Sequence, residues 1–285
     1  MKRTYNVNEN YFEVLDTPEK AYILGFIYAD GYNREDLLEL VQNIERKDIL
    51  DNIKEALQAE HPIKEYTPGR LTLNIGSVKL CKDLTNLGAF RNKSLSCNFP
   101  DFIQEPLMSS FILGYFDGDG CVWDGKRKKM VVKDTSRASG YRERIVHNVK
   151  FTFTGNSLFI NALQDYLVRL GIVNKKTKLN FSKAKNSDTN TCDKVCSMEY
   201  SGRKQLRNLY NYMYKYSPIW CKEKKEKFIK IFCASEEKFS EDTSLTAGNP
   251  EMEISNQASV IEEGSSTIPE MGVESSDSKC EAPNT

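Results

Sequence analysis

The chain has 285 residues, of which 39% are hydrophobic and 28% charged, which is ordinary for a globular protein. The longest apolar run, residues 21–29, is too short to cross a bilayer, and the N-terminus lacks the apolar stretch of a signal peptide. We therefore expect an intracellular protein, in the cytoplasm, a nucleoid or an organelle, and not a secreted one. The eight cysteines form no CxxC pair and no zinc spacing with the two histidines, so we expect free thiols.

The net charge of zero conceals an asymmetry along the chain. Residues 235–285 hold 12 acidic residues and two lysines, whereas residues 1–234 hold 38 basic and 28 acidic residues. The acidic segment is rich in Ser, Glu, Pro and Gly and has one aromatic residue, so it is predicted to be a disordered tail. A basic body beside such a tail favours a polyanionic partner for the body.

The spacing of apolar residues predicts helices and strands in a repeated order. A helix at 21–31 precedes a strand at 36–44, a helix at 47–60 with Asp48 as N-cap, strands at 63–66 and 70–75, and a helix at 77–87 ended by Gly88. Then come a helix at 110–120, a strand at 149–154, a helix at 157–170 ended by Gly171, strands at 177–181 and 197–200, and helices at 203–214 and 222–232. Each half, residues 1–107 and 108–234, is predicted to be helix–strand–strand–helix–strand–strand–helix, with one strand of the first pair not assigned to residues. The predicted fold class is α+β.

The helices at residues 21–31 and 110–120 are two copies of one motif. Both run aromatic-Ile-Leu-Gly-aromatic-apolar-x-small-Asp-Gly from their second residue, and they start 89 residues apart. Gly25 and Ala29 share one face of the first helix, as Gly114 and Gly118 share one face of the second. Glycine within a helix costs about 1 kcal/mol relative to alanine. The small residues therefore predict an interface in which the two helix backbones approach closely around a pseudo-twofold axis.

Asp30 and Asp119 fall in the last turns of these helices, and Gly31 and Gly120 follow them as predicted C-terminal caps. Acids are unfavourable at a helix C-terminus, and two carboxylates brought together by parallel packed helices need raised pKa values or a bound cation. Carboxylates and backbone carbonyls, here those of Ala29 and Gly118, suit Mg²⁺ that keeps several of its waters. Beside a basic surface, such a site predicts metal-dependent hydrolysis of phosphodiester bonds.

Two other interpretations of the motif are weaker. Each copy alone could be only a core helix that ends in a common Asp-Gly turn, but two copies that match at nearly every position argue against this. Residues 117–120 could begin an EF-hand. That interpretation fails because later positions of the calcium loop would be Cys121, Val122 and Lys128.

These residues resemble the LAGLIDADG homing endonuclease family, in its single-chain form with two motifs. Residues 23–31 and 112–120 match the nine-residue motif, with conservative departures at the first, second, fourth and fifth places. The sixth place is Tyr28 in the first copy and Asp117 in the second, whereas both copies keep the acid at the eighth place. Residues 87–94 also resemble the segment from Leu-Gly to Lys-Ser seen in many members.

The resemblance implies a monomer of two αββαββα units whose sheets form a saddle over double-stranded DNA. Asp30 and Asp119 would bind divalent metal and cut both strands across the minor groove. A long, asymmetric target would be read mainly in the major groove by side chains of the sheets. Gln42, Lys93 and Lys150 are candidates for polar groups near the scissile phosphates.

The second half has a long basic insertion between its motif and the next strand, at residues 121–148, where the first half has four residues. The resemblance implies that this hairpin contacts DNA. Alternation at 149–154 also places Val149, Phe151 and Phe153 on one strand face and Lys150, Thr152 and Thr154 on the other. The expected DNA contacts are Lys126, Arg127, Lys128, Lys129, Arg142, Arg144, Lys150 and Thr152, with Lys133 and Arg137 in the same insertion.

Two alternatives to cleavage remain open. The same scaffold could bind nucleic acid without cutting it, as a maturase of group I intron RNA or as a transcription regulator. The intact acids in both motifs favour cleavage, since a binder has no need of them. An intein is disfavoured, because Val146, His147 and Asn148 are followed by Val149 where a nucleophile would be required.

Overall fold

The computed structural model describes residues 4–93, 96–132, 141–181 and 195–244. The chain divides into two compact units, residues 1–242 and 243–285. Most of the acidic segment, from residue 245, lies outside the described residues, as do Lys133 and Arg137. None of the helices within the described ranges is long and apolar enough to span a membrane.

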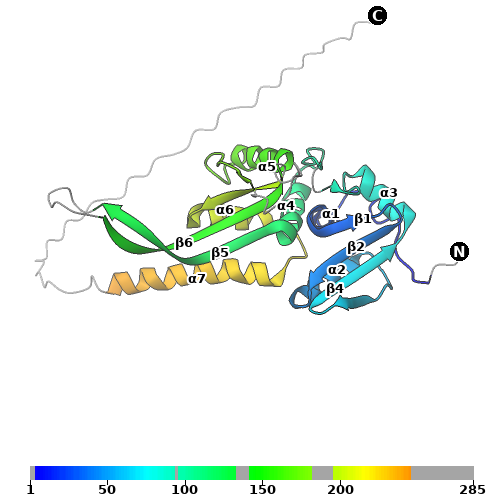
Figure 1. The fold of residues 1–285 in the computed structure, drawn as a ribbon, viewed down its shortest axis with the longest axis horizontal. Helices are drawn as coiled ribbons and strands as arrows, with labels where there is room; N and C mark the ends of the chain where they lie inside the picture. The colour runs from blue at the N-terminus through cyan, green and yellow to red at the C-terminus, as the bar shows by residue number, and fades with distance from the viewer. Residues whose placement is uncertain (1–3, 94–95, 133–140, 182–194, 245–285) are drawn as a thin grey trace, which may run out of the picture. The chain divides into compact units, whose positions relative to one another are not determined.

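The first half forms one antiparallel sheet with three α-helices (Figure 1). Its elements are α1 (Pro18–Asp30), β1 (Gly31–Asn33), β2 (Leu37–Asn43), the 3-10 helix η1 (Ile44–Arg46), α2 (Lys47–Ala56), β3 (Ile63–Thr67), β4 (Arg70–Gly76) and α3 (Val78–Asn86). The strand order is β1-β2-β4-β3. The side chain of Thr17 caps the start of α1 by accepting a hydrogen bond from the Lys20 amide.

The second half repeats this arrangement with the strand order β5-β6-β8-β7. Its elements are α4 (Leu107–Asp119), β5 (Gly120–Val132), β6 (Tyr141–Asn156), α5 (Ser157–Arg169), β7 (Asn180–Phe181), β8 (Val195–Ser201), α6 (Arg203–Met213) and α7 (Lys222–Ser244). The predicted α+β fold of two helix–strand–strand–helix–strand–strand–helix units is confirmed. β5 and β6 form the long hairpin of Figure 1, and their thirteen described pairs run from Gly120 opposite Phe153 to Val132 opposite Tyr141.

The predicted alternation in β6 is also confirmed. Val149, Phe151 and Phe153 are buried in the core, whereas Lys150 and Thr152 are only partly buried. The described cysteines are all free thiols, as expected: Cys81, Cys97, Cys121, Cys196, Cys221 and Cys233.

The two motif helices, α1 and α4, lie side by side where the halves meet (Figure 1). A Cβ atom added to Gly25 would lie 2.0 Å from the carbonyl oxygen of Phe111, and one added to Gly114 would lie 1.9 Å from that of Tyr22. The contacts are reciprocal, because each glycine meets the residue three positions before the glycine of the other copy. The backbones are thus too close for any side chain at either position.

The motif glycines Gly31 and Gly120 are the C-cap residues of α1 and α4, as predicted. Both have extended backbones, with φ of −79° and −96°, because each helix runs directly into a strand. A Cβ atom would lie 2.7 Å from the Ile27 side chain at Gly31 and 2.2 Å from that of Phe116 at Gly120. Glycine is needed here for space and not for its backbone freedom.

Three other details differ from the sequence expectations. The short strand β1 was not predicted, because its three residues are too few to show a period. Asp48 lies in the first turn of α2 instead of capping it, and the N-cap position is occupied by Arg46. The last helix, α7, continues to Ser244, past the expected start of the tail at residue 235.

Candidate active site

The structure brings Asp30 and Asp119 together at the adjoining C-terminal ends of α1 and α4. Both side chains are partly buried. A Cβ atom added to Gly118 would lie 2.3 Å from the Ala29 Cβ and 3.4 Å from Asp30 Oδ2, so the Asp30 carboxylate reaches over the end of α4. Burial, and then the negative charge of Asp30, raise the pKa of Asp119 to about 6. The helix packing therefore holds two mutually repelling acids in one place.

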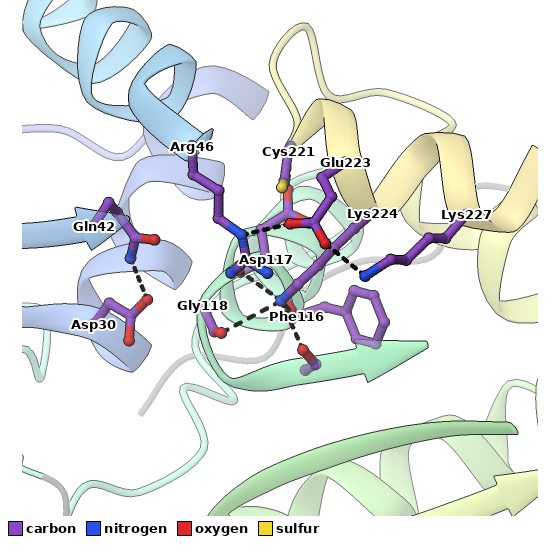
Figure 2. Close-up of polar contacts among 11 residues, drawn as sticks. Asp30, Gln42, Arg46, Phe116, Asp117, Gly118, Cys221, Glu223, Lys224 and Lys227 are labelled. Carbon is purple, nitrogen blue, oxygen red and sulfur yellow. Dashed lines mark hydrogen bonds and ion pairs between the residues drawn. The ribbon is translucent and has the colours of Figure 1, made fainter. Parts of the chain in front are cut away.

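Asp30 lies next to Gln42, which stabilises its charge (Figure 2). Gln42, on β2, donates its side-chain amide to Asp30 Oδ2 at 2.5 Å. Burial raises the pKa of Asp30, and the Gln42 hydrogen bond followed by nearby cations opposes that rise. The carboxylate opens onto a polar cleft of about 270 Å³, lined by Asp30, Val41, Gln42, Asn43, Arg46, Arg70 and Gly118.

Asp119 has no counterpart of Gln42. Gly31 pairs with Leu40 and Gly120 with Phe153, so the position two residues further along the second strand is Gln42 in one half and Gly155 in the other. A Cβ atom at Gly155 would lie 2.3 Å from the Tyr115 hydroxyl, which itself donates to the Thr154 carbonyl. Within the described residues no group donates a hydrogen bond to Asp119.

A buried lysine closes the carbonyl end of each motif helix. Lys93 Nζ donates to the carbonyl oxygen of Gly31, just after α1. Lys224 Nζ donates to the carbonyl oxygens of Phe116, Asp117 and Gly120 at 2.7, 2.7 and 2.6 Å, and more weakly to that of Gly118 at 3.3 Å. A cation suits this end of a helix, where the carbonyls lack amide partners and the dipole is negative.

The lysine charges also reach the two acids. Burial lowers the pKa of Lys93, and the charges of Cys97, Asp119 and Asp30 oppose that change. Burial likewise lowers the pKa of Lys224, chiefly against the neighbouring Asp117. Two cations thus partly balance the carboxylates.

Arg46 joins the two halves beside the cleft. Its Nε donates to Glu223 Oε2 on α7 at 2.8 Å, and Glu223 accepts a second hydrogen bond from Lys227 at 2.5 Å (Figure 2). The Lys227 hydrogen bond, followed by that of Arg46, holds the pKa of Glu223 at about 2. Arg46 also lines the cleft that contains Asp30.

The ligands available at this site fit a magnesium ion better than a metal that needs a full set of protein ligands. Over the described residues no three His, Cys, Asp or Glu side chains come close enough to share a metal. Two carboxylates with nearby backbone carbonyls leave positions for water and phosphate oxygens, which Mg²⁺ prefers to retain. Because the charges of Asp30 and Asp119 repel each other, a cation bound between them would be stabilising.

The predicted polar neighbours divide into two groups. Gln42 and Lys93 lie at the carboxylates, as described above. Lys150 is instead paired with Glu199 of β8 at 2.7 Å and lies over the Trp123 ring, 5.3 Å from its centroid. No described interaction connects Lys150 to either acid, so the structure does not bring it into the catalytic group.

The predicted DNA contacts fall on different faces of the β5–β6 hairpin. Lys150 and Thr152 lie on the face opposite the buried residues of β6. Lys126 and Lys128 are exposed, but alternation places them on the face of the buried Val122. The side chains of Arg127, Lys129, Arg142 and Arg144 lie outside the described part of the structure, although their backbones belong to β5 and β6.

Sequence reasoning missed four residues of this site: Arg46, Arg70, Asp117 and Lys224. The repeat offers a signal for one of them, because Lys93 follows the third helix of its half and an equivalent lysine is expected after α6. Four lysines between residues 222 and 227 satisfy that condition, so the repeat alone does not select Lys224. Asp117 was singled out only as a departure between the copies.

A comparison with known protein families finds a match in the second half of the chain. Residues 106–213 match the family model described as a LAGLIDADG-like domain. The same motif in α1 and the matching strand order extend the resemblance to the LAGLIDADG homing endonucleases over the first half. Curated protein sequences give no significant match.

Solved structures with similar folds include three such nucleases. The I-LtrWI LAGLIDADG homing endonuclease bound to target DNA is 16% identical, with a TM-score of 0.49, over 81% of this chain and 92% of that one. The meganuclease I-AabMI bound to uncleaved DNA is 15% identical, with a TM-score of 0.47, over 81% and 94%. I-SmaMI, bound to an uncleaved DNA target in the presence of calcium ions, is 12% identical, with a TM-score of 0.47, over 78% and 92%.

Proposed function

We propose that this protein is a site-specific endonuclease that cuts both strands of DNA at a long, asymmetric target, as a monomer and with Mg²⁺. The observation that carries the proposal is the pairing of Asp30 and Asp119 at the ends of two tightly packed helices. Such a pair is costly for folding, so a structure that keeps it favours a role in chemistry. Homing of an intron is the biological role that fits the family resemblance.

The roles of the side chains follow from their positions. A bound Mg²⁺, held by Asp30, Asp119 and the carbonyls of Ala29 and Gly118, would lower the pKa of water and stabilise charge on the phosphate. Gln42 fixes the orientation of Asp30 through its 2.5 Å hydrogen bond. Lys93 and Lys224 keep positive charge beside the reacting phosphates while they hold the helix ends in place.

Arg46 and Arg70 border the cleft that contains Asp30, where they can bind a phosphate of the strand to be cut. The polar face of β6, with Lys150 and Thr152, is the candidate surface for reading base edges in the major groove. The basic hairpin β5–β6 adds contacts to DNA phosphates from the second half.

A randomised library of duplex DNA tests the proposal. The full chain is incubated with the library and Mg²⁺ or with a chelator, and cut ends are sequenced. We expect double-strand breaks at one enriched long sequence, only with Mg²⁺. Sequence-selective binding without cutting would overturn the nuclease proposal in favour of a regulator. Preferential binding of structured intron RNA would favour a maturase.

A further inference from the structure

The two copies of the motif differ at the sixth place, which is Tyr28 in α1 and Asp117 in α4. Each of these side chains makes a hydrogen bond to the backbone a few residues before the buried lysine of its own half. The Tyr28 hydroxyl, in α1, donates to the Leu87 carbonyl at 2.6 Å. The Asp117 carboxylate, in α4, accepts from the Cys221 backbone amide at 2.7 Å (Figure 2). Leu87 follows α3 and Cys221 precedes α7, so each bond holds the chain just before the lysine of its own half.

These bonds are short-range anchors for the lysines. Leu87 lies six residues before Lys93, and Cys221 lies three residues before Lys224. Both lysines are almost fully buried, with exposed fractions of 4% and 3%. Each donates to the carbonyl end of the same helix that carries the anchoring side chain. The helix therefore fixes both the acid and the cation that act at its end.

The residues around Tyr28 and Asp117 are arranged to accommodate these two side chains. The Tyr28 hydroxyl lies 2.0 Å from where a Cβ atom of Gly88 would be, so that glycine makes room for it. Asp117 is fully buried, and its Oδ2 also accepts a hydrogen bond from the Tyr22 hydroxyl of α1 at 2.7 Å. Its Oδ1 has no hydrogen-bond partner among the described residues. A buried carboxylate with an unused oxygen is costly, which argues for a specific task.

We propose that Tyr28 and Asp117 are positioning residues, each of which holds the lysine of its own half at the end of its motif helix. The expected effect of these residues on DNA cleavage rests on the proposed function, whereas their effect on the placement of the two lysines does not. It explains why the chemistry of the sixth place changes between the copies. In the first half the segment presents a carbonyl and needs a donor, whereas in the second it presents an amide and needs an acceptor.

Lysine labelling tests this without DNA or metal. The full-length protein and the variants Tyr28→Phe and Asp117→Ala are treated briefly with an amine-acetylating reagent, and each lysine is quantified by mass spectrometry. Tyr28→Phe loses one buried hydrogen bond, which favours local opening by about tenfold. Asp117→Ala loses the bonds from Cys221 and Tyr22 and should favour opening at least as much. We expect Tyr28→Phe to raise labelling of Lys93 by about that factor, with Lys224 unchanged, and Asp117→Ala to do the reverse.

Asp117→Asn is the conservative control, because its amide oxygen can still accept from the Cys221 amide. It should restore most of the protection of Lys224. Equal labelling of both lysines in each variant, or no increase in either, would overturn the inference. If Asp117→Ala fails to fold by circular dichroism, Asp117→Leu, which has a similar shape and no acceptor, takes its place in the crossed comparison with Tyr28→Phe.

Strand-resolved cleavage then separates this inference from the proposed function. On a duplex labelled separately on each strand, Tyr28→Phe should slow the strand that is slowed by Lys93→Met, and Asp117→Ala the strand slowed by Lys224→Met. The paired double variants should be non-additive. If the wild-type protein cuts no DNA, the proposed function fails while crossed labelling still stands. If labelling is not crossed but cleavage occurs, only the positioning inference fails.

Discussion

In the first half, Asp30 accepts a hydrogen bond from Gln42 and opens onto a cleft with two arginines. In the second half, Asp119 occupies the same place on its helix, but glycine replaces the amide and the carboxyl carries a pKa raised to about 6. The second half instead has the long basic hairpin and the more extensively bonded lysine, Lys224. The comparison shows that the backbone symmetry is set by the helix interface, whereas the side chains around each acid are free to diverge.

The feature that both halves share is the close packing of α1 against α4, and substitutions of its glycines should have the largest effect. Gly25→Ala and Gly114→Ala should each lower the free energy of unfolding by about 3 kcal/mol or more, because each Cβ would overlap a backbone oxygen of the other helix. Chemical denaturation measures both. Gly76→Ala is the control, since a Cβ there meets no atom and the change should stay below about 1 kcal/mol. Unequal losses at Gly25 and Gly114 would contradict the pseudo-twofold packing.

The raised pKa of Asp119 predicts that its replacement by asparagine stabilises the protein at neutral pH. Because the pKa of Asp119 rises from 3.8 to about 6 on folding, the folded protein binds more protons than the unfolded chain between these pH values. The free energy of unfolding therefore falls as the pH rises through this window. Asp119→Asn should gain roughly 2 kcal/mol at pH 7, and the gain should vanish near pH 4.

Thermal unfolding across that pH range measures the effect. Asp101→Asn, at an exposed carboxyl, is the control and should change little. A lower free energy of unfolding for Asp119→Asn than for the wild-type protein at pH 7 would contradict the prediction, because it would show that the charged Asp119 stabilises the fold.

Gln42 sharpens the comparison because only the first half has it. Gln42→Ala should slow cutting of one DNA strand by about tenfold and leave the other strand unchanged, since it removes one hydrogen bond from one acid. A duplex labelled on each strand in turn gives the two rates. Gln205→Ala, which loses contacts at Ser201 and Asn174 away from the acids, is the control. Equal slowing of both strands would mean that the acids work as one indivisible unit.

The smallest expected effect concerns the faces of the second sheet. Lys150→Ala should reduce the salt dependence of DNA binding by about one unit of slope, because it removes one positive charge from the face that meets DNA. Lys126→Ala should leave the slope unchanged, because Lys126 lies on the strand face of the buried Val122. Binding titrations over a range of salt concentrations measure both slopes. The opposite ranking would place DNA on the other face of the hairpin.

The sequence predicts the frame of the site well, for physical reasons that are local. Small residues at helical spacing require a close partner, and the two copies of the motif supply it, so Asp30 and Asp119 are found from the pattern alone. Alternation in β6 likewise separates Phe151 and Phe153 from Lys150. These features depend on spacing within one element.

The rest of the site depends on contacts between distant parts of the chain. Arg46 pairs with Glu223, 177 residues away, and nothing near either residue signals the pair. Lys224 is one of four lysines in a short stretch, and only the direction of α7 selects it. The partner of Lys150 is equally out of reach of the sequence, because its pairing with Glu199 is set by strand order.

The most direct test of a shared two-acid active site is cleavage of the enriched target by the wild-type protein, Asp30→Asn and Asp119→Asn, with binding measured in parallel. Each variant keeps the shape of its side chain and loses the charge that a metal needs. We expect double-strand cutting to fall by at least about a hundredfold in both variants, with affinity for the target retained. Full cutting by either variant would contradict a site built from both motif helices.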